Sequence, residues 1–230
     1  MYKFLCLIFC FNLTWACAEP TLMLRQITKL NGSRIVYINS QGLQIINQKQ
    51  NVEIITKLPQ LQIYYVNKYR KLYYVTNLNS LPKPRGTQII SIYFDNGNLV
   101  NRKEFWTKYK YDSKLNYSIY RFKSNPNNIR QRSAIGELKL GNFKKINQNL
   151  LMVLNKISYF PDLDNIVLEI NGFNSSTNVE KLIETKSIKY IDYDIHDPDL
   201  KSLKRAQTLN NIFEYDSESN TINNFANFAN

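Results

Sequence analysis

Cysteine is scarce in this sequence of 230 residues, and its three cysteines, Cys6, Cys10 and Cys17, all lie within the first 17 residues. The chain after Cys17 therefore has no thiol to form a disulfide, to act as a nucleophile or to bind a metal. Small secreted domains often depend on disulfides for stability. This chain is long enough to bury an adequate core without them.

Glycine and histidine are also scarce, with 7 glycines and a single histidine, His196. The phosphate-binding motifs G-x-G-x-x-G and G-x-x-x-x-G-K-[ST] are absent, as is the G-x-S-x-G motif of serine hydrolases. Histidine-dependent catalysis is restricted to His196, and no cofactor is expected. A pair of catalytic carboxylates stays open, because sequence does not give the distance between two side chains.

Long hydrophobic runs are missing, and the longest apolar stretch belongs to a predicted signal peptide over residues 1–18. Lys3 precedes an apolar run over residues 4–11, and Ala16-Cys17-Ala18 forms an A-x-A cleavage site. The run is too short for a membrane anchor, which needs about 20 residues. Lipid attachment to Cys17, as in a bacterial lipoprotein, is the alternative. We predict a secreted or cell-surface protein, peripheral to any membrane.

Three N-x-S/T sequons follow the predicted cleavage site, at Asn31, Asn116 and Asn174. If the host glycosylates its secreted proteins, these asparagines are candidate attachment sites on the surface.

Acidic residues are few in the first part of the chain. Residues 19–145 hold 22 basic and 6 acidic residues, a net charge of +16, whereas residues 146–230 hold 7 basic and 12 acidic residues, a net charge of −5. Such asymmetry favours an anionic partner for the basic part, either a glycan or a membrane surface. A basic surface that is merely solvated is the alternative. Nucleic acid is not expected to be a partner of a secreted protein.

The residue pattern after the signal predicts an α+β fold, in which an N-terminal antiparallel β-meander is followed by a helix–strand–helix section. Runs rich in Ile, Val and Tyr, bounded by Asn, Gly and Pro, are typical of strands. They predict strands over residues 34–38, 43–47, 52–58, 61–66, 71–78 and 87–94, with further strands over 104–112 and 116–123.

Helices are predicted in the second part. Apolar residues three or four apart indicate an amphipathic helix over residues 143–157. Strands are predicted over 165–170 and 187–195, and helices over 178–185 and 197–213. Asp197 and Pro198 suit the N-cap and first position of the last helix.

The predicted organisation is a signal peptide (1–18), a basic β-rich region (19–135), an α/β region (136–215) and a disordered tail (216–230). The loop over residues 123–136 is the candidate boundary. The α/β region has only about 80 residues, so it can pack on the same core as the β-rich region.

The segment "IDYDIHDPD" (191–199) is the first candidate site. If residues 187–195 form a strand, Asp192, Asp194 and His196 project from one face, because side chains of a strand alternate between its two faces. Two carboxylates and an imidazole can bind a divalent cation or support acid–base catalysis. The alternative is a solvent-exposed polar face, with Asp197 capping a helix.

The segment "KYKYDSKLNYSIYRFK" (108–123) is the second candidate site, because cations alternate there with aromatic rings. Such a mixture suits a polyanion. In a regular strand the lysines would form a basic outer face and the tyrosines a buried one. The candidate polyanion contacts are Lys108, Lys110, Lys114, Arg121 and Lys123.

The signal "MYKFLCLIFCFNLTWACA" and the Lys- and Tyr-rich body, such as "KEFWTKYKYDSKLNYSIY", resemble the small signal-bearing surface antigens of piroplasm parasites. The resemblance implies a non-enzymatic protein displayed outside the cell. The polar end "SESNTINNFANFAN" departs from the anchored antigens, so firm membrane attachment is not expected. The rival hypothesis is a secreted hydrolase or metal-dependent enzyme that uses Asp192, Asp194 and His196.

Secretion makes a direct prediction about the mature N-terminus. Mass spectrometry of protein isolated from its own secretory host should find a chain that starts at Glu19, because the A-x-A site ends at Ala18. A chain that starts at Cys17 and carries a lipid would contradict cleavage at this site.

Overall fold

The computed structural model describes residues 20–29, 32–81, 106–112, 117–122, 137–143, 146–158, 163, 165–173 and 179–213. The predicted signal peptide, Asn31, Asn116 and Asn174, the strand over 87–94, the loop over 123–136 and the tail over 216–230 lie outside these ranges. Among the described residues, no helix is long and apolar enough to cross a membrane.

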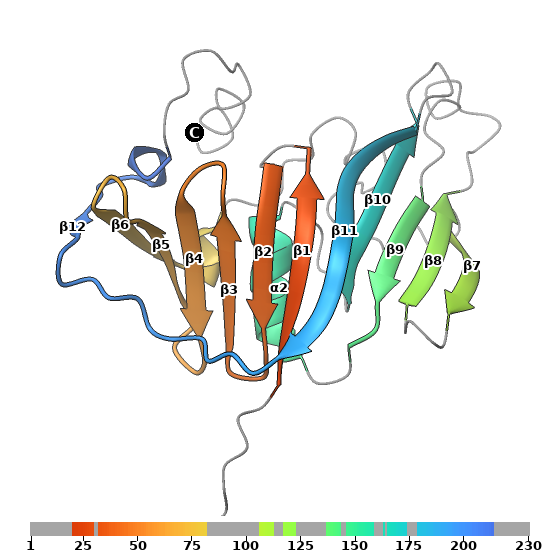
Figure 1. Ribbon diagram of the computed structural model, residues 1–230, viewed down its shortest axis with the longest axis horizontal. Helices are drawn as coiled ribbons and strands as arrows, with labels where there is room; N and C mark the ends of the chain where they lie inside the picture. The colour runs from red at the N-terminus through yellow and green to blue at the C-terminus, as the bar shows by residue number, and fades with distance from the viewer. Residues whose placement is uncertain are drawn as a thin grey trace, which may run out of the picture.

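One 12-stranded sheet organises the structure, in the order β12-β6-β5-β4-β3-β2-β1-β11-β10-β9-β8-β7 (Figure 1). Neighbouring strands are antiparallel, except that β12 runs parallel to β6. The bounds are β1 Thr21–Thr28, β2 Gly32–Ile38, β3 Gly42–Asn47, β4 Val52–Lys57, β5 Gln62–Asn67, β6 Leu72–Asn77, β7 Trp106–Asp112, β8 Tyr117–Phe122, β9 Glu137–Gly141, β10 Ile166–Phe173, β11 Val179–Ile191 and β12 Lys204–Arg205.

Strands β3 to β6 repeat every ten residues, as six-residue strands joined by four-residue turns. Two of these turns share one construction. The side-chain oxygen of Asn47 accepts from the Gln50 amide (3.2 Å), and that of Asn67 accepts from the Arg70 amide (2.9 Å). Both turns close with a left-handed residue, Asn51 (φ 53°) or Lys71 (φ 55°). The five strands predicted between residues 34 and 78 are therefore present, and so are those over 104–112 and 116–123.

The first and last parts of the chain meet at the centre of the sheet. Strand β1 pairs with β2 on one side and with β11 on the other, and β11 pairs in turn with β10. Residues 21–28 thus lie beside residues 183–191, which are far away in sequence.

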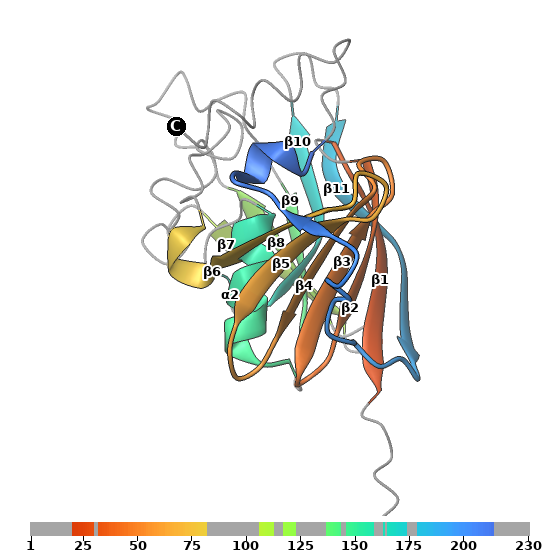
Figure 2. The same ribbon diagram turned by 90° about the vertical axis from the view of Figure 1, so that its left-hand side faces the viewer.

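Helix α2 (Gln148–Ile157) covers one face of the sheet, as Figure 2 shows. The side chain of Asn147 caps it by accepting from the Asn149 amide (2.9 Å). For this reason the helix starts later than the predicted residue 143. Its buried side chains Leu150, Leu151, Val153 and Leu154 pack in one cluster with inward-facing residues of β1 to β5 and β10.

A polar network interrupts this apolar core beneath the C-terminal end of α2. Arg34 of β2 is only 4% exposed. Its Nε and Nη2 donate to Gln26 Oε1 of β1 (3.0 and 2.8 Å), and its Nη1 donates to Ser158 Oγ, at the C-cap of α2 (3.0 Å). Burial lowers the pKa of Arg34 to about 10, so the guanidinium is charged at neutral pH. These partners are uncharged, and the negative end of the α2 dipole helps to stabilise the cation.

Gln26 extends the network to the C-terminal strands. Its Nε2 donates to the Val167 carbonyl of β10 (3.0 Å) and to Thr185 Oγ1 of β11 (3.0 Å). Thr185 in turn donates to the Leu168 carbonyl (2.6 Å). The network therefore joins β1, β2, β10, β11 and α2.

The predicted α+β fold class is wrong, because the described residues of the second part form no helix–strand–helix section. Residues 178–185, predicted as a helix, belong largely to β11. Ile183 pairs there with Thr28 of β1 and with Ile170 of β10. Hydrogen bonding to a strand on each side satisfies the backbone of this segment, and this tertiary pairing overrides its helical pattern.

Residues 197–213, also predicted as a helix, form an extended segment instead, with the two-residue β12 and a short 3₁₀ turn over Leu209–Asn211. The Lys204 amide donates to the Lys71 carbonyl (2.9 Å), and the Ala206 amide donates to the Tyr73 carbonyl (2.7 Å). Pairing with the edge of β6 thus takes the place of the hydrogen bonds within a helix. Near the end of the segment, Ile212 is fully buried in the core cluster.

The Arg34 network should dominate the effect of single substitutions on stability. Replacing Gln26 by alanine removes the acceptor of two Arg34 donors and leaves a buried cation poorly paired. We expect the free energy of unfolding, measured with urea, to fall by about 3 kcal/mol.

The double variant Gln26→Leu/Arg34→Met is the matched test, because it removes the charge together with its acceptor. It should be more stable than Gln26→Ala alone. If the double variant instead loses the sum of the effects of Gln26→Leu and Arg34→Met, each measured alone, the two residues are not coupled.

Candidate functional site

The candidate metal residues lie on an extended segment, residues 192–203, which we call the strap. Tyr193 and Ile195 point toward the sheet, and Asp192, Asp194 and His196 are exposed. Tyr193 stacks on Tyr37 of β2, with ring centroids 4.3 Å apart and planes inclined by 21°. The Tyr193 hydroxyl donates to Gln44 Oε1 of β3 (2.8 Å), and burial raises the pKa of Tyr193.

The strap runs over the face of the sheet opposite to α2, as Figure 1 shows at the lower ends of β1 to β4. Tyr37 and Gln44 alternate along their strands with Val36 and Leu43, which belong to the core cluster. The alternation predicted from the sequence is thus present, although residues 192–195 are outside β11. The side chains of Tyr193 and Ile195 pack on the sheet, and the polar side chains that alternate with them face solvent.

The polar members do not converge on a cation site. His196 Nδ1 lies 3.3 Å from Asp194 Oδ2, but the two side chains are 80% and 74% exposed. Asp197, the predicted helix cap, lies instead 3.8 Å from Lys57 Nζ of β4. Among the described residues, no group of three or more His, Cys, Asp and Glu side chains is placed to hold a metal.

The candidate polyanion residues are only partly described. Lys108 and Lys110 belong to β7 and Arg121 to β8, while Lys114 and Lys123 lie outside the described ranges. The pairing register between β7 and β8 shifts between Lys108 and Lys110. A bulge therefore interrupts the regular alternation on which the predicted basic face was based.

A different set of cations, missed by the sequence analysis, gathers at one edge of the meander. In an antiparallel meander every second turn lies at the same edge, so the β1–β2, β3–β4 and β5–β6 turns are neighbours (Figure 1). We call their exposed cations, together with those of the adjacent β12, the basic row. Its members are Lys29, Lys49, Lys68, Arg70, Lys71, Lys204 and Arg205.

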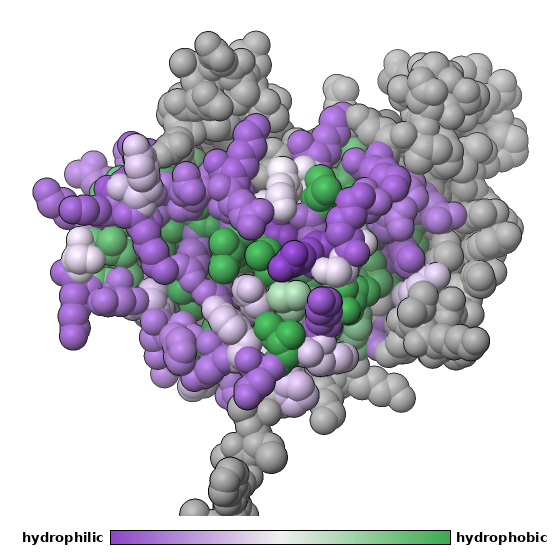
Figure 3. Space-filling view, in the orientation of Figure 1, coloured by the Kyte–Doolittle hydropathy of each residue, from purple (hydrophilic) through white to green (hydrophobic). Residues whose placement is uncertain are grey.

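The basic row is a continuous feature. A Cβ built on Gly32 would lie 3.5 Å from Lys49 Cβ, so the start of β2 lies against the β3–β4 turn. The Lys204 amide donates to the Lys71 carbonyl, which joins β12 to the third turn. Because adjacent strands lie about 4.8 Å apart, successive turns of this edge are about 10 Å apart. Figure 3 shows hydrophilic side chains projecting along this margin, at the upper left.

Acidic residues lie beside the row but not in its turns. The residues of its three turns include no aspartate or glutamate. Glu53 of β4 pairs with Lys68 (2.9 Å), and Arg70 Nη1 donates to the Phe213 carbonyl (2.8 Å). The signal that could have found the row is the ten-residue spacing, which places basic residues in every second turn.

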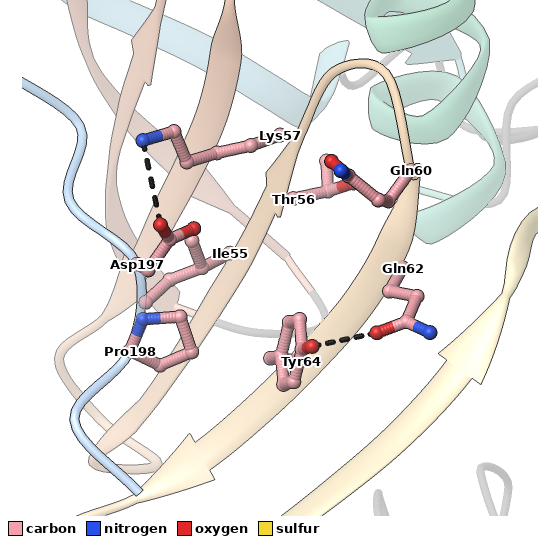
Figure 4. Close-up of a pocket in the computed structure, with 8 residues that line it drawn as sticks. All are labelled: Ile55, Thr56, Lys57, Gln60, Gln62, Tyr64, Asp197 and Pro198. Carbon is pink, nitrogen blue, oxygen red and sulfur yellow. Dashed lines mark hydrogen bonds and ion pairs between the residues drawn. The ribbon is translucent and has the colours of Figure 1, made fainter.

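The opposite edge of the meander carries a small open pocket of about 200 Å³ (Figure 4). Lys57 of β4 and Tyr64 of β5 form part of its floor, and Asp197 and Pro198 of the strap form a wall. The Tyr64 hydroxyl donates to Gln62 Oε1 (2.6 Å).

No protein-family model matches this chain, and no curated protein matches it either. The resemblance to piroplasm surface antigens therefore stays a prediction from sequence style, and any function must be argued from the geometry.

Divalent cations should not bind to Asp192, Asp194 and His196. All three side chains are exposed, so little surrounding structure fixes their orientation, and tight sites need fixed coordination geometry. Calorimetric titration with Ca²⁺, Mg²⁺, Mn²⁺ or Zn²⁺ should show no specific heat. Micromolar binding that disappears in His196→Ala would contradict this expectation.

Proposed function

We propose that the protein is a non-enzymatic, secreted or surface-associated binding protein whose basic row holds a sulfated glycan chain. The observation that carries this proposal is the row itself, because three successive turns and β12 present exposed cations along one edge of the sheet. The piroplasm-antigen resemblance, with its implied display outside the cell, agrees with such a partner.

The shape of the row favours a chain-like polyanion over a flat membrane. Its members follow the edge of one sheet, with about 10 Å between turns, and so form a line rather than a plane. Tyr69, in the middle of the third turn, is 79% exposed and stands between Lys68 and Arg70. An exposed ring between two cations offers a flat apolar surface beside anion contacts, which suits a sulfated sugar chain.

The enzyme hypothesis receives no comparable support. The pair formed by Asp194 and His196 lies open to solvent, whereas catalytic groups usually lie in a cleft that encloses the substrate.

Heparin chromatography tests the proposal with the variant Lys49→Gln/Lys68→Gln/Arg70→Gln. It should elute at clearly lower salt than the parent protein, because binding of a variant with fewer cation contacts releases fewer counterions from heparin. The slope of log affinity against log salt should fall by roughly 3, about one unit for each cation removed.

The control variant, Lys156→Gln/Lys189→Gln/Lys201→Gln, has the same net charge as the test variant, but its basic row is intact. It should elute close to the parent protein. If both variants elute at the same lower salt concentration, heparin binding depends on net charge and not on the basic row, and the proposal is overturned. Binding to phosphatidylserine vesicles without retention on heparin would also overturn it, since the partner would then be a membrane.

A further inference from the structure

The pocket at the opposite edge of the meander is built from two neighbouring strands and the strap. Ile55 of β4 pairs directly with Tyr64 of β5, and their side chains share the face opposite to α2. Lys57 and Gln62 lie one step nearer the turn on the same two strands. Asp197 and Pro198 close the side, and Figure 4 shows Lys57 and Ile55 directed toward them, whereas the Tyr64 hydroxyl points to Gln62.

The size of the pocket restricts its ligand. Sites for drug-sized molecules measure about 300–1,000 Å³. At about 200 Å³ this open pocket has room for one group of the size of a sugar ring or an amino acid.

The chemistry of the lining favours an uncharged, hydroxyl-rich ring. Lys57 and Asp197 carry opposite charges 3.8 Å apart, so they offer a strong donor and a strong acceptor with no net charge. Gln60 and Gln62 add amide donors and acceptors. The ring of Tyr64, with Pro198, supplies a small apolar surface for the carbon face of a ring.

The wall formed by the strap is held in place before any ligand arrives. Ile195 is 2% exposed, and a Cβ built on Gly42 of β3 would lie only 3.2 Å from its Cγ2. The Thr21 hydroxyl donates to the Tyr193 carbonyl (2.6 Å), and the two stacked tyrosines fix the same stretch. A preformed wall avoids the entropic cost of ordering a loop on binding.

We propose that this pocket binds one neutral sugar ring, with Asp197 and Lys57 bonded to its hydroxyl groups and Tyr64 against its carbon face. This site is separate from the basic row. The two lie at opposite ends of six-residue strands, about 20 Å apart. Neutral sugars carry no anion, so their binding is independent of the proposed polyanion binding.

Two-dimensional NMR of the full chain tests the proposal, with glucose, galactose, mannose and N-acetylglucosamine as probes. At least one of these sugars should shift the amide signals of residues 55–64 and 196–198, with a dissociation constant on the order of 1 mM. Asp197→Asn should weaken this binding about tenfold, because hydrogen bonds to a charged acceptor are lost.

Three further variants make the test specific. Asp199→Asn is the matched control, since Asp199 lies on the same strap but its carboxylate accepts from the Lys201 amide (3.1 Å), and it should bind as the parent does. Tyr64→Phe keeps the ring and should retain binding, whereas Tyr64→Ala should abolish it. A thermal melt checks that each variant is folded.

Three results would overturn the proposal. In the first, no sugar shifts the pocket signals. In the second, the shifts persist unchanged in both Asp197→Asn and folded Tyr64→Ala, so that the sugar binds elsewhere. In the third, glycine shifts the pocket signals and the sugars do not, which would make the ligand a zwitterion held between Lys57 and Asp197.

Discussion

The buried positive charge of Arg34 is the constraint on which the rest of the structure depends. A guanidinium in an apolar core is costly unless its donors are satisfied, and here the acceptors are the neutral Gln26 and Ser158. Gln26 can accept in that position only while its amide group is held by β10 and β11. The network between β1 and β2 is therefore complete only when the distant C-terminal strands are also in place. This side chain adds to the backbone pairing of β1 with β11 in coupling the local meander to the remote half of the sheet.

The meander built on this centre turns a sequence repeat into a spatial separation of charge. A ten-residue unit places alternate turns at opposite edges, so basic turns gather at one edge and the acidic strap lies near the other. A six-residue strand is about 20 Å long, whereas the Debye length at physiological salt is about 8 Å. The aspartates of the strap are thus largely screened from the basic row. The net charge of the chain consequently understates the local attraction for a polyanion.

Elements that depend on interactions between residues close in sequence could be predicted, whereas those that depend on distant residues could not. The strands between residues 34 and 78 were predictable, because Ile, Val and Tyr runs and short turns specify a meander locally. Residues 178–185 were not, since their strand depends on β1, which lies more than a hundred residues away. Asp197 and Pro198 gave a genuine helix-start signal, but hydrogen bonding to the edge of β6 opposed it. The basic row was hidden for a related reason, because its cations become neighbours only once the turns are known to alternate between edges.

The strap shows how one pattern can be correct while its chemical interpretation is not. Alternation over residues 192–196 is real, yet it sorts Tyr193 and Ile195 onto the sheet and leaves Asp192, Asp194 and His196 in water. The apolar members contribute binding to the sheet through burial, about 25 cal/mol for each Å² of apolar surface, whereas an exposed pair such as His196 and Asp194 contributes little. Because these inward anchors immobilise the strap, Asp197 is held over β4 beside Lys57 although its own ion pair is long and exposed. Recognition at the pocket therefore depends on apolar contacts outside it. The acidic residue of the pocket is Asp197, which lies next to the predicted cluster of Asp192, Asp194 and His196 and was not part of it.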